Sequence, residues 1–168
     1  YPFLGKPLIC HTIDSALNCN IFNKIIVTSD SNQILQIASD FSNKVICLKR
    51  PDGISDDITM PDSAVAHAIK EVQKILGFIP ENTTFLQPTS PLRRIQDIIN
   101  CNTLLEQDSK FNSVISVHKS HDFFWSNSEN GKYLPSYGEI RPRRQDYFQY
   151  VENGSIYVTR SKYFIKKN

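Results

Sequence analysis

The sequence predicts an α/β fold with three layers, in which helices cover both faces of a mostly parallel sheet. Strand-like and helix-like segments alternate along most of the chain, and this alternation is typical of βαβ units. The length of 168 residues and the hydrophobic content of 40% are enough for one domain with a real core. We therefore expect a single domain over residues 1–168.

The first part of the chain supplies four of the expected elements. Apolar residues at helical spacing predict helices, and short β-branched runs that end in polar residues predict strands. In chain order these elements are a helix in 7–17, a strand in 24–30, a helix in 31–41 and a strand in 44–48.

The middle of the chain continues the same pattern. Pro61 fits the first turn of a helix, and Gly77 lies just past its end. The expected elements are a helix in 61–76, a strand in 84–87, a helix in 95–107 and a strand in 113–117.

The alternation breaks over residues 118–152. This segment is aromatic, arginine-rich and rich in turn residues, without a clear period. Long segments of this kind inside compact domains are often functional. The run 155–159, "SIYVT", then predicts a return to the sheet as a strand.

Composition excludes several classes of protein. The net charge of +2 is too small to indicate a nucleic-acid partner, and no apolar run reaches the roughly 20 residues of a membrane span. The four cysteines form no CxxC pair, which favours free thiols in a reducing compartment. We expect a cytoplasmic protein with no nucleic-acid or membrane partner.

Three of the predicted strands end in polar residues. These ends are Ser29-Asp30, Lys49-Arg50 and the segment 87–90. Ligands of open α/β sheets bind beyond the carboxyl ends of the strands. We therefore expect these residues to line one binding rim.

The stretch "QPTSPLR" over residues 87–93 has two interpretations. Gln87 offers an uncharged acceptor and two donors, and the flanking prolines hold the backbone ready for a ligand. Alternatively, Thr89 or Ser90 caps the next helix, with Pro91 in its first turn. Local chemistry leaves both open, and they do not exclude each other.

Three arginines, Arg141, Arg143 and Arg144, form a second candidate site. Arginine forks suit carboxylate and phosphate oxygens. A solvated surface cluster is the ordinary alternative, but neighbouring aromatic residues could form the wall of a pocket. At another strand end, Arg50 could contact a base or a phosphate. Asp56 and Asp57 could bind a metal, although a turn or a helix cap is favoured for them.

Seven motifs together resemble one enzyme family, the N-acylneuraminate cytidylyltransferases or CMP-sialic acid synthetases. In chain order they are "LGKPLICHTIDSAL", "KIIVTSDS", "RPDGISDD", "FLQPTSPLR", "SVISV", "RPRRQD" and "ENGSIYV". The resemblance implies a Rossmann-like nucleotide-diphosphosugar transferase fold. It also implies that CTP and a nine-carbon acidic sugar react to give a CMP-sugar and pyrophosphate with Mg²⁺, and that the protein is a homodimer.

The resemblance also implies roles for single residues. Relatives that handle ordinary sugars often have a metal-binding aspartate where Gln87 stands, so a neutral group there would spare an acidic sugar from repulsion. By position in the motifs, Arg50 and Thr59 are nucleotide-binding, Gln87, Thr89, Arg144 and Tyr157 are sugar-binding, and Arg141 and Arg144 are catalytic.

Two parts of the family pattern are expected outside this chain. The phosphate-cradling loop should precede Tyr1, and the aspartate pair that holds Mg²⁺ should follow Asn168, so no metal ligand is assigned within the chain. We expect the chain as given to be an inactive fragment of an active parent. Val151 stands near a place where some bacterial members have an arginine, and "YVENG" is one residue shorter than usual.

Two other functions remain open. One is a nucleotidyltransferase for another acidic sugar, such as an eight-carbon acid, although "RPRRQD" is associated with the nine-carbon branch. The other is a non-catalytic module that binds a nucleotide or a sugar. Flanking sequence with a phosphate loop and an aspartate pair would favour an enzyme over the binding module.

Overall fold

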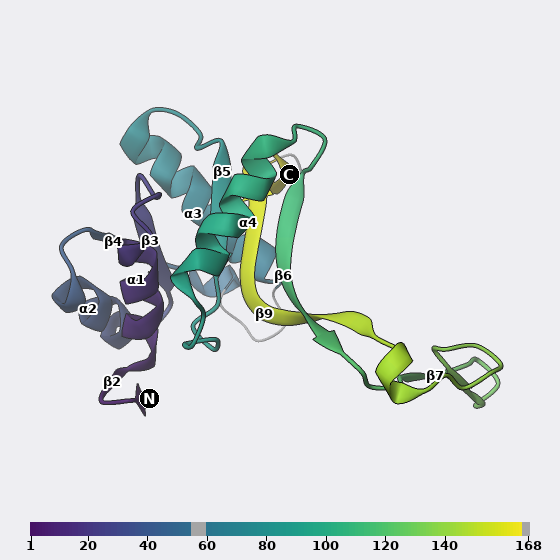
Figure 1. Ribbon diagram of the computed structural model, residues 1–168. Helices are drawn as coiled ribbons and strands as arrows, with labels where there is room; N and C mark the ends of the chain where they lie inside the picture. Colours follow the sequence, from purple (N-terminus) through teal and green to yellow (C-terminus); the bar gives the residue numbers. More distant parts are fainter. Residues whose placement is uncertain (55–59, 166–168) are drawn as a thin grey trace. The chain divides into compact units, whose positions relative to one another are not determined.

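The computed structural model describes residues 1–54 and 60–165. It divides into two compact units (Figure 1). The first unit comprises Tyr1–Ser116 together with Gly154–Asn168, and the second unit comprises Val117–Asn153.

The helices and strands agree closely with the alternation in the sequence. The strands are β1 Pro2–Phe3, β2 Lys6–Pro7, β3 Ile25–Ser29, β4 Val45–Lys49, β5 Asn82–Leu86, β6 Ser113–Ser120, β7 Trp125–Asn127, β8 Tyr133–Pro135 and β9 Gln149–Arg160. The helices are α1 Leu8–Asn18, α2 Asn32–Phe41, α3 Pro61–Leu76, α4 Ile95–Gln107 and α5 Lys162–Ile165, with short 3-10 turns η1 Asp52–Ile54 and η2 Arg144–Asp146.

Local signals account for the limits of two helices. Ser31 caps α2, because its hydroxyl accepts a hydrogen bond from the N–H of Ile34. Pro61 lies in the first turn of α3, and Gly77 ends that helix with a positive φ of 77°. The limits of α3 confirm the prediction from sequence, whereas the cap at Ser31 was not predicted.

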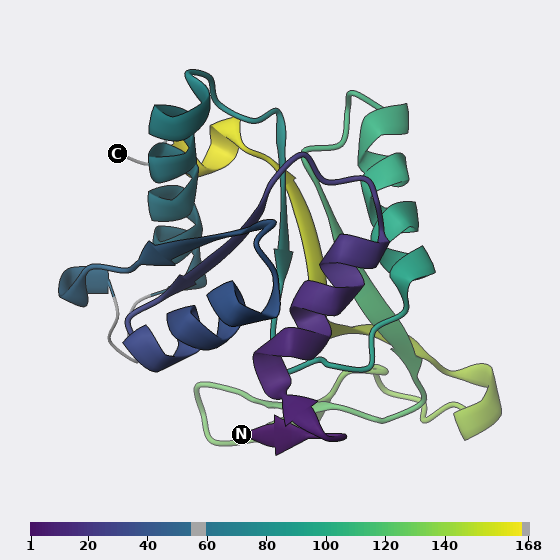
Figure 2. The ribbon, with the colours of Figure 1, turned by 90° about the vertical axis from the view of Figure 1, so that its left-hand side faces the viewer.

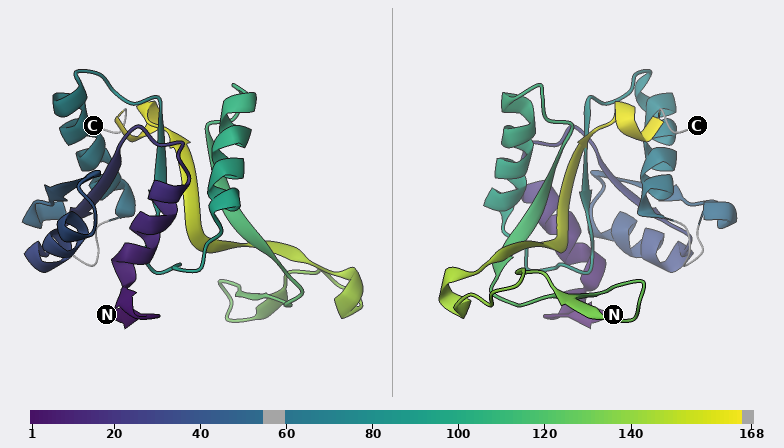
Figure 3. Two further views of the ribbon diagram at one scale, coloured as in Figure 1. Left: turned by 60° about the vertical axis from the view of Figure 1, so that its left-hand side comes forward. Right: turned by 90° about the vertical axis from the view of Figure 1, so that its right-hand side faces the viewer.

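The sheets are mixed, which differs from the predicted mostly parallel sheet. Strands β3 and β4 are parallel, with Ile25 opposite Val45 and Ser29 opposite Lys49. Strand β9 lies between β5 and β6 and runs antiparallel to β5 (Figure 3). The chain enters β9 after the long segment that follows β6 and not through a helical crossover, so no parallel pairing is imposed.

Two apolar clusters hold the first unit together. In one, Ile98 and Leu105 of α4 pack with Ile156 and Val158 of β9, and all four are almost fully buried. In the other, Ile13, Val27 and Ala38 join α1, β3 and α2. Figure 2 shows α4 along β9 and β6, and α2 beside β3 and β4. These clusters pack β4 and β5, the strands directly followed by Arg50 and Gln87.

The second unit is built around aromatic rings. The Phe123 ring stacks on Tyr147 at a centroid distance of 5.0 Å and meets Tyr137 edge-on at 5.1 Å. Strands β7 and β8 pair as an antiparallel hairpin in the same unit. Side-chain packing thus orders a segment in which the sequence shows no clear period.

The described helices and the four cysteines bear on what the composition led us to expect. Within residues 1–54 and 60–165, no helix is long and apolar enough to cross a bilayer. All four cysteines are free, and Cys10, Cys19 and Cys101 are buried. Burial raises the pKa of each of these three thiols, as expected for small buried hydrophobic side chains.

Candidate functional site

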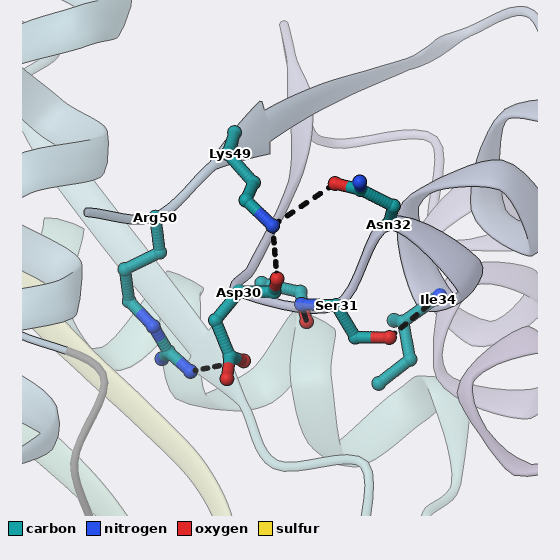
Figure 4. A network of polar contacts seen from close by, with 7 residues as sticks. Asp30, Ser31, Asn32, Ile34, Lys49 and Arg50 are labelled. Atoms are coloured by element: carbon teal, nitrogen blue, oxygen red, sulfur yellow. Dashed lines mark hydrogen bonds and ion pairs between the residues drawn. The ribbon is translucent and has the colours of Figure 1, made fainter. Parts of the chain in front are cut away.

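The ends of β3 and β4 meet in a polar network (Figure 4). Lys49 donates from Nζ to the carbonyl oxygen of Asp30 and, at 2.9 Å, to Oδ1 of Asn32. Arg50 Nη2 lies 3.3 Å from Oδ1 of Asp30. Parallel pairing of the two strands therefore brings two of the three predicted strand ends to one rim.

Charge in this network favours the ionised form of Asp30. Its own backbone N–H, and then the Arg50 guanidinium, lower the pKa of that carboxyl. The side chain of Arg50 is 25% exposed, and its backbone N–H donates to the Ser29 carbonyl at 2.9 Å. Arg50 is thus held at the rim beside an ionised carboxylate. Its predicted companion Thr59, with Asp56 and Asp57, lies outside the described residues.

The third strand end forms a turn and not a helix cap. Helix α4 begins at Ile95 with Arg94 at its N-cap and no side-chain cap, so of the two interpretations left open, the helix cap at Thr89 or Ser90 is not what the structure has. The N–H of Ser90 donates instead to the Gln87 carbonyl at 3.2 Å. The turn adds residues between strand and helix, and these keep the hydroxyls of this loop away from the helix terminus.

Gly154 of β9 lies directly against the side chain of Gln87. Its φ is 65°, and a Cβ built there would be 3.0 Å from Oε1 of Gln87. The hydroxyl of Ser90 donates to the Gly154 carbonyl at 3.3 Å. The loop after β5 and the middle of β9 therefore form one contact, with Gln87 at its centre.

Arg93 connects the same two segments through hydrogen bonds. Its Nη2 donates to the carbonyl of Gln87 and, at 3.2 Å, to that of Ser155. Its Nε donates to Ser155 Oγ at 3.2 Å, and its Nη1 donates to Thr12 Oγ1 at 2.9 Å. These four acceptors are neutral oxygens. Burial lowers the pKa of Arg93 to about 10, which leaves it protonated at neutral pH.

Tyr157, predicted to be part of the sugar pocket, lies on β9 opposite Phe85 of β5. The two rings are 6.1 Å apart between centroids. Thr89 is exposed in the turn. The first unit thus groups Gln87, Thr89 and Tyr157 on the β5–β9 pair and its loop.

The predicted catalytic arginines lie in the second unit. Arg141 lies over the Phe123 ring, with its Cζ 4.6 Å from the centroid. Arg144 lies 3.3 Å from Oδ1 of Asp122, and its side chain is 70% exposed. The Ser120 hydroxyl, and then Arg144, lower the pKa of Asp122. Arg144 is therefore an accessible cation whose protein partner is an exposed carboxylate.

An open hollow in the second unit is lined by His121, Arg144 and Gln145. His121 Nδ1 lies 3.0 Å from the Arg144 carbonyl and 2.7 Å from the Tyr147 carbonyl. Carbonyls only accept hydrogen bonds, so Nδ1 carries the proton. This contact fixes the backbone of η2, on which Arg144 is the first residue.

A metal does not fit the residues that the structure describes. Among residues 1–54 and 60–165, there is no group of three or more His, Cys, Asp or Glu side chains that could hold an ion. Asp30 and Asp122 are each paired with an arginine. The described residues therefore present no assembled set of side-chain ligands for Mg²⁺.

Sequence reasoning missed two residues of this site. Arg93 stood within a quoted motif but was given no role, because its partners Thr12 and Ser155 are 81 and 62 positions away. Gly154 stands within the motif "ENGSIYV", where an Asn-Gly pair indicates a turn rather than a close contact. A single glycine directly before the predicted strand 155–159 is the signal that could have indicated a close backbone approach.

Known proteins share both the sequence pattern and the fold. A pseudaminic acid cytidylyltransferase of Campylobacter jejuni is 30% identical, over 99% of this chain and 72% of its own length. An N-acylneuraminate cytidylyltransferase of Escherichia coli is 28% identical, over 96% of this chain and 38% of its own length.

A solved structure gives an independent comparison of the fold. The CMP:2-keto-3-deoxy-manno-octonic acid synthetase complexed with CTP superposes with a TM-score of 0.68 and 19% identity, covering 98% of this chain and 67% of that one. At this identity the likeness shows the fold alone. The family model described as Cytidylyltransferase matches residues 1–164, so this chain belongs to the cytidylyltransferase family.

Proposed function

We propose that the protein containing this chain is a nucleotidyltransferase that activates a nine-carbon acidic sugar with CTP, giving a CMP-sugar and pyrophosphate. The observation that supports an acidic sugar as the substrate is the neutral strand end at Gln87, and the nine-carbon class follows the motif "RPRRQD". The loop 87–94 presents amide and hydroxyl groups and contains no carboxylate. A sugar carboxylate could therefore bind nearby without repulsion from this loop.

The reaction needs positioning more than covalent chemistry. The anomeric hydroxyl oxygen of the sugar attacks the α-phosphorus of CTP and forms the new P–O bond. The bond from that phosphorus to the bridging oxygen breaks, pyrophosphate leaves with the electron pair, and the hydroxyl proton is released. Negative charge builds on phosphate oxygens, so preorganised cations and donors lower the barrier.

Residues of both units have proposed roles in this reaction. Arg50, held at the rim beside Asp30, and Thr59 would bind the nucleotide. Gln87, Thr89 and Tyr157 would bind the sugar. Arg141 and Arg144 would contact the sugar or the reacting phosphate, and Arg144 can exchange its exposed partner Asp122 for an anionic ligand group.

Mg²⁺, a homodimer and a cytoplasmic location complete the proposal. Mg²⁺ would be held by residues outside those described. Exposed apolar side chains of the second unit favour self-association; they include Trp125, Tyr133, Leu134, Ile140 and Tyr150. Four free cysteines favour a reducing compartment.

An eight-carbon acidic sugar is the second candidate substrate. A solved synthetase of that class shares the fold and is complexed with CTP. The neutral strand end at Gln87 would suit either acid. The identity of the acid is thus the first quantity to measure.

The test is pyrophosphate release by the full-length protein with CTP and Mg²⁺. Separate reactions contain N-acetylneuraminate, other nine-carbon acids, the eight-carbon acid or no sugar. We expect release with one nine-carbon acid, and strong suppression of it in Arg144→Ala and Gln87→Ala. No release with any acid, by protein that binds CTP, would support the non-catalytic binding module instead.

A further inference from the structure

Two sets of contacts connect Gln87 to β9, one through its backbone carbonyl and one at its side chain. Its backbone carbonyl accepts hydrogen bonds from Ser90 N–H and from Arg93, which also holds both oxygens of Ser155. Its side-chain oxygen lies against Gly154. The backbone carbonyl is thus linked through Arg93 to Ser155, and the side-chain amide lies beside the space that Gly154 leaves open.

The approach at Gly154 is closer than at the other glycines. Gly5, Gly77, Gly131 and Gly138 share a positive φ with Gly154, but no atom lies within 4 Å of a Cβ placed on any of them. At Gly154 the nearest atom would be the Gln87 Oε1 at 3.0 Å. Because that atom ends a flexible side chain, a methyl group there would displace the amide and leave the backbone in place.

Arg93 supplies the other half of this arrangement. A guanidinium whose partners are four neutral oxygens gives up the Coulomb energy of an ion pair. Its planar fork instead forms several directed hydrogen bonds, which hold Gln87 in a fixed position relative to β9 and to Thr12 of α1. A lysine could keep the charge but not the fork.

We propose that Gly154 and Arg93 are positioning residues that set the orientation of the Gln87 amide and thereby the affinity for the acidic sugar. The effect on sugar affinity rests on the proposed function, whereas the effect on the amide does not. Gly154 acts through the space it leaves, and Arg93 acts through the backbone carbonyl it holds.

The first test observes the amide itself in the full-length protein. Glutamine side chains are labelled with ¹⁵N, and the Gln87 signal is identified by its loss in Gln87→Ala. We expect Gly154→Ala and Arg93→Lys to shift that signal. Gly77→Ala is the matched control, because it carries the same positive-φ strain with open space around it. An unmoved Gln87 signal in both variants would overturn the proposal, whether or not the protein is active.

The second test measures kinetics with the acid that supports pyrophosphate release. Gly154→Ala should raise the KM for the sugar about tenfold, as for loss of one good hydrogen bond, with the KM for CTP unchanged. In a Gln87→Ala background the same change should alter the sugar KM less than about twofold. An equal cost in both backgrounds, or an equal rise in the KM for CTP, would mean that Gly154 has only a structural role. A wild-type protein without activity would instead refute the proposed function and leave the first test decisive.

Discussion

Arg93 and Arg144 are the same side chain in two different environments. Arg93, in the first unit, is partly buried and donates to four neutral oxygens. Arg144, in the second unit, is 70% exposed and pairs with the Asp122 carboxylate at 3.3 Å. Loss of the Arg93 hydrogen bonds would separate the loop after β5 from β9. Arg144, by contrast, can exchange the Asp122 carboxylate for an anionic group of a ligand. The difference separates an arginine that shapes the site from one that can act on a substrate.

Removal of Arg93 should have the largest effect on stability. Arg93→Ala leaves partly buried acceptors without their charged donor, so we expect a loss of about 3 kcal/mol in the free energy of unfolding. Urea titration of the full-length protein measures it. Arg93→Lys should lose roughly half as much, because it keeps one donor but not the fork. A change of less than about 0.5 kcal/mol in Arg93→Ala would remove the contrast with Arg144.

Removal of Arg144 should show the opposite pattern. Arg144→Ala is expected to lower kcat/KM about 100-fold, as for loss of a charged group that stabilises the transition state, and to change stability by less than about 0.5 kcal/mol. The measurements are pyrophosphate release and urea titration on the same sample. Arg143→Ala is the control, since Arg143 is a neighbouring exposed arginine. If both variants lose activity equally, general positive charge and not a specific contact is responsible.

Two neighbouring hydroxyls of the loop sharpen the comparison on a smaller scale. The Ser90 hydroxyl donates to Gly154 at 3.3 Å, near the long end of hydrogen-bond distances, so Ser90→Ala should cost about 0.5 kcal/mol of stability. Thr89 is exposed, and Thr89→Ala should leave stability unchanged but raise the sugar KM about threefold. The reverse pattern would mean that the roles of the two hydroxyls are exchanged.

The smallest effect concerns pH. The Ser120 hydroxyl, and then Arg144, lower the pKa of Asp122 below its ordinary value of 3.8. The stability that this carboxylate contributes is therefore present above that value and is lost as pH falls through the lowered pKa. The hydrogen-bond partners of Arg93 among the described residues are neutral oxygens and its pKa is about 10, so these contacts should not change over the acid range. NMR titration of Asp122 should give a midpoint below 3.8; a midpoint at or above it would contradict the pairing.

Local sequence patterns predicted the helix limits and strand ends, because neighbouring residues determine these features. The limits of α3 follow from Pro61 and Gly77, and Gln87 was singled out because a strand ends there in an amide. The order of strands does not follow from such patterns, because "SIYVT" looks the same in a parallel or an antiparallel pair. The position of β9 between β5 and β6 depends on contacts between residues far apart in the chain.

The candidate site, too, was predicted only where its residues stand in a local pattern. Gln87 and Arg50 were found because they stand at strand ends. Arg93 and Gly154 were not assigned roles, because their contacts join residues that are far apart in the chain. The sequence shows neither the neutral acceptors of Arg93 nor the Gln87 amide beside Gly154. The sequence could not decide for a related reason whether Ser90 caps the helix, since its hydroxyl has a partner on β9, 64 positions away.

The most direct test of the central claim is a competition in a single reaction. Full-length protein, CTP and Mg²⁺ are supplied with equal amounts of a nine-carbon acid, such as N-acetylneuraminate or pseudaminic acid, and of the eight-carbon acid, and the CMP-sugars formed are identified by mass spectrometry. We expect the CMP derivative of the nine-carbon acid to be the main product and to disappear in Arg144→Ala. A product containing only the eight-carbon acid, or no CMP-sugar with any acid tested, would contradict the central claim.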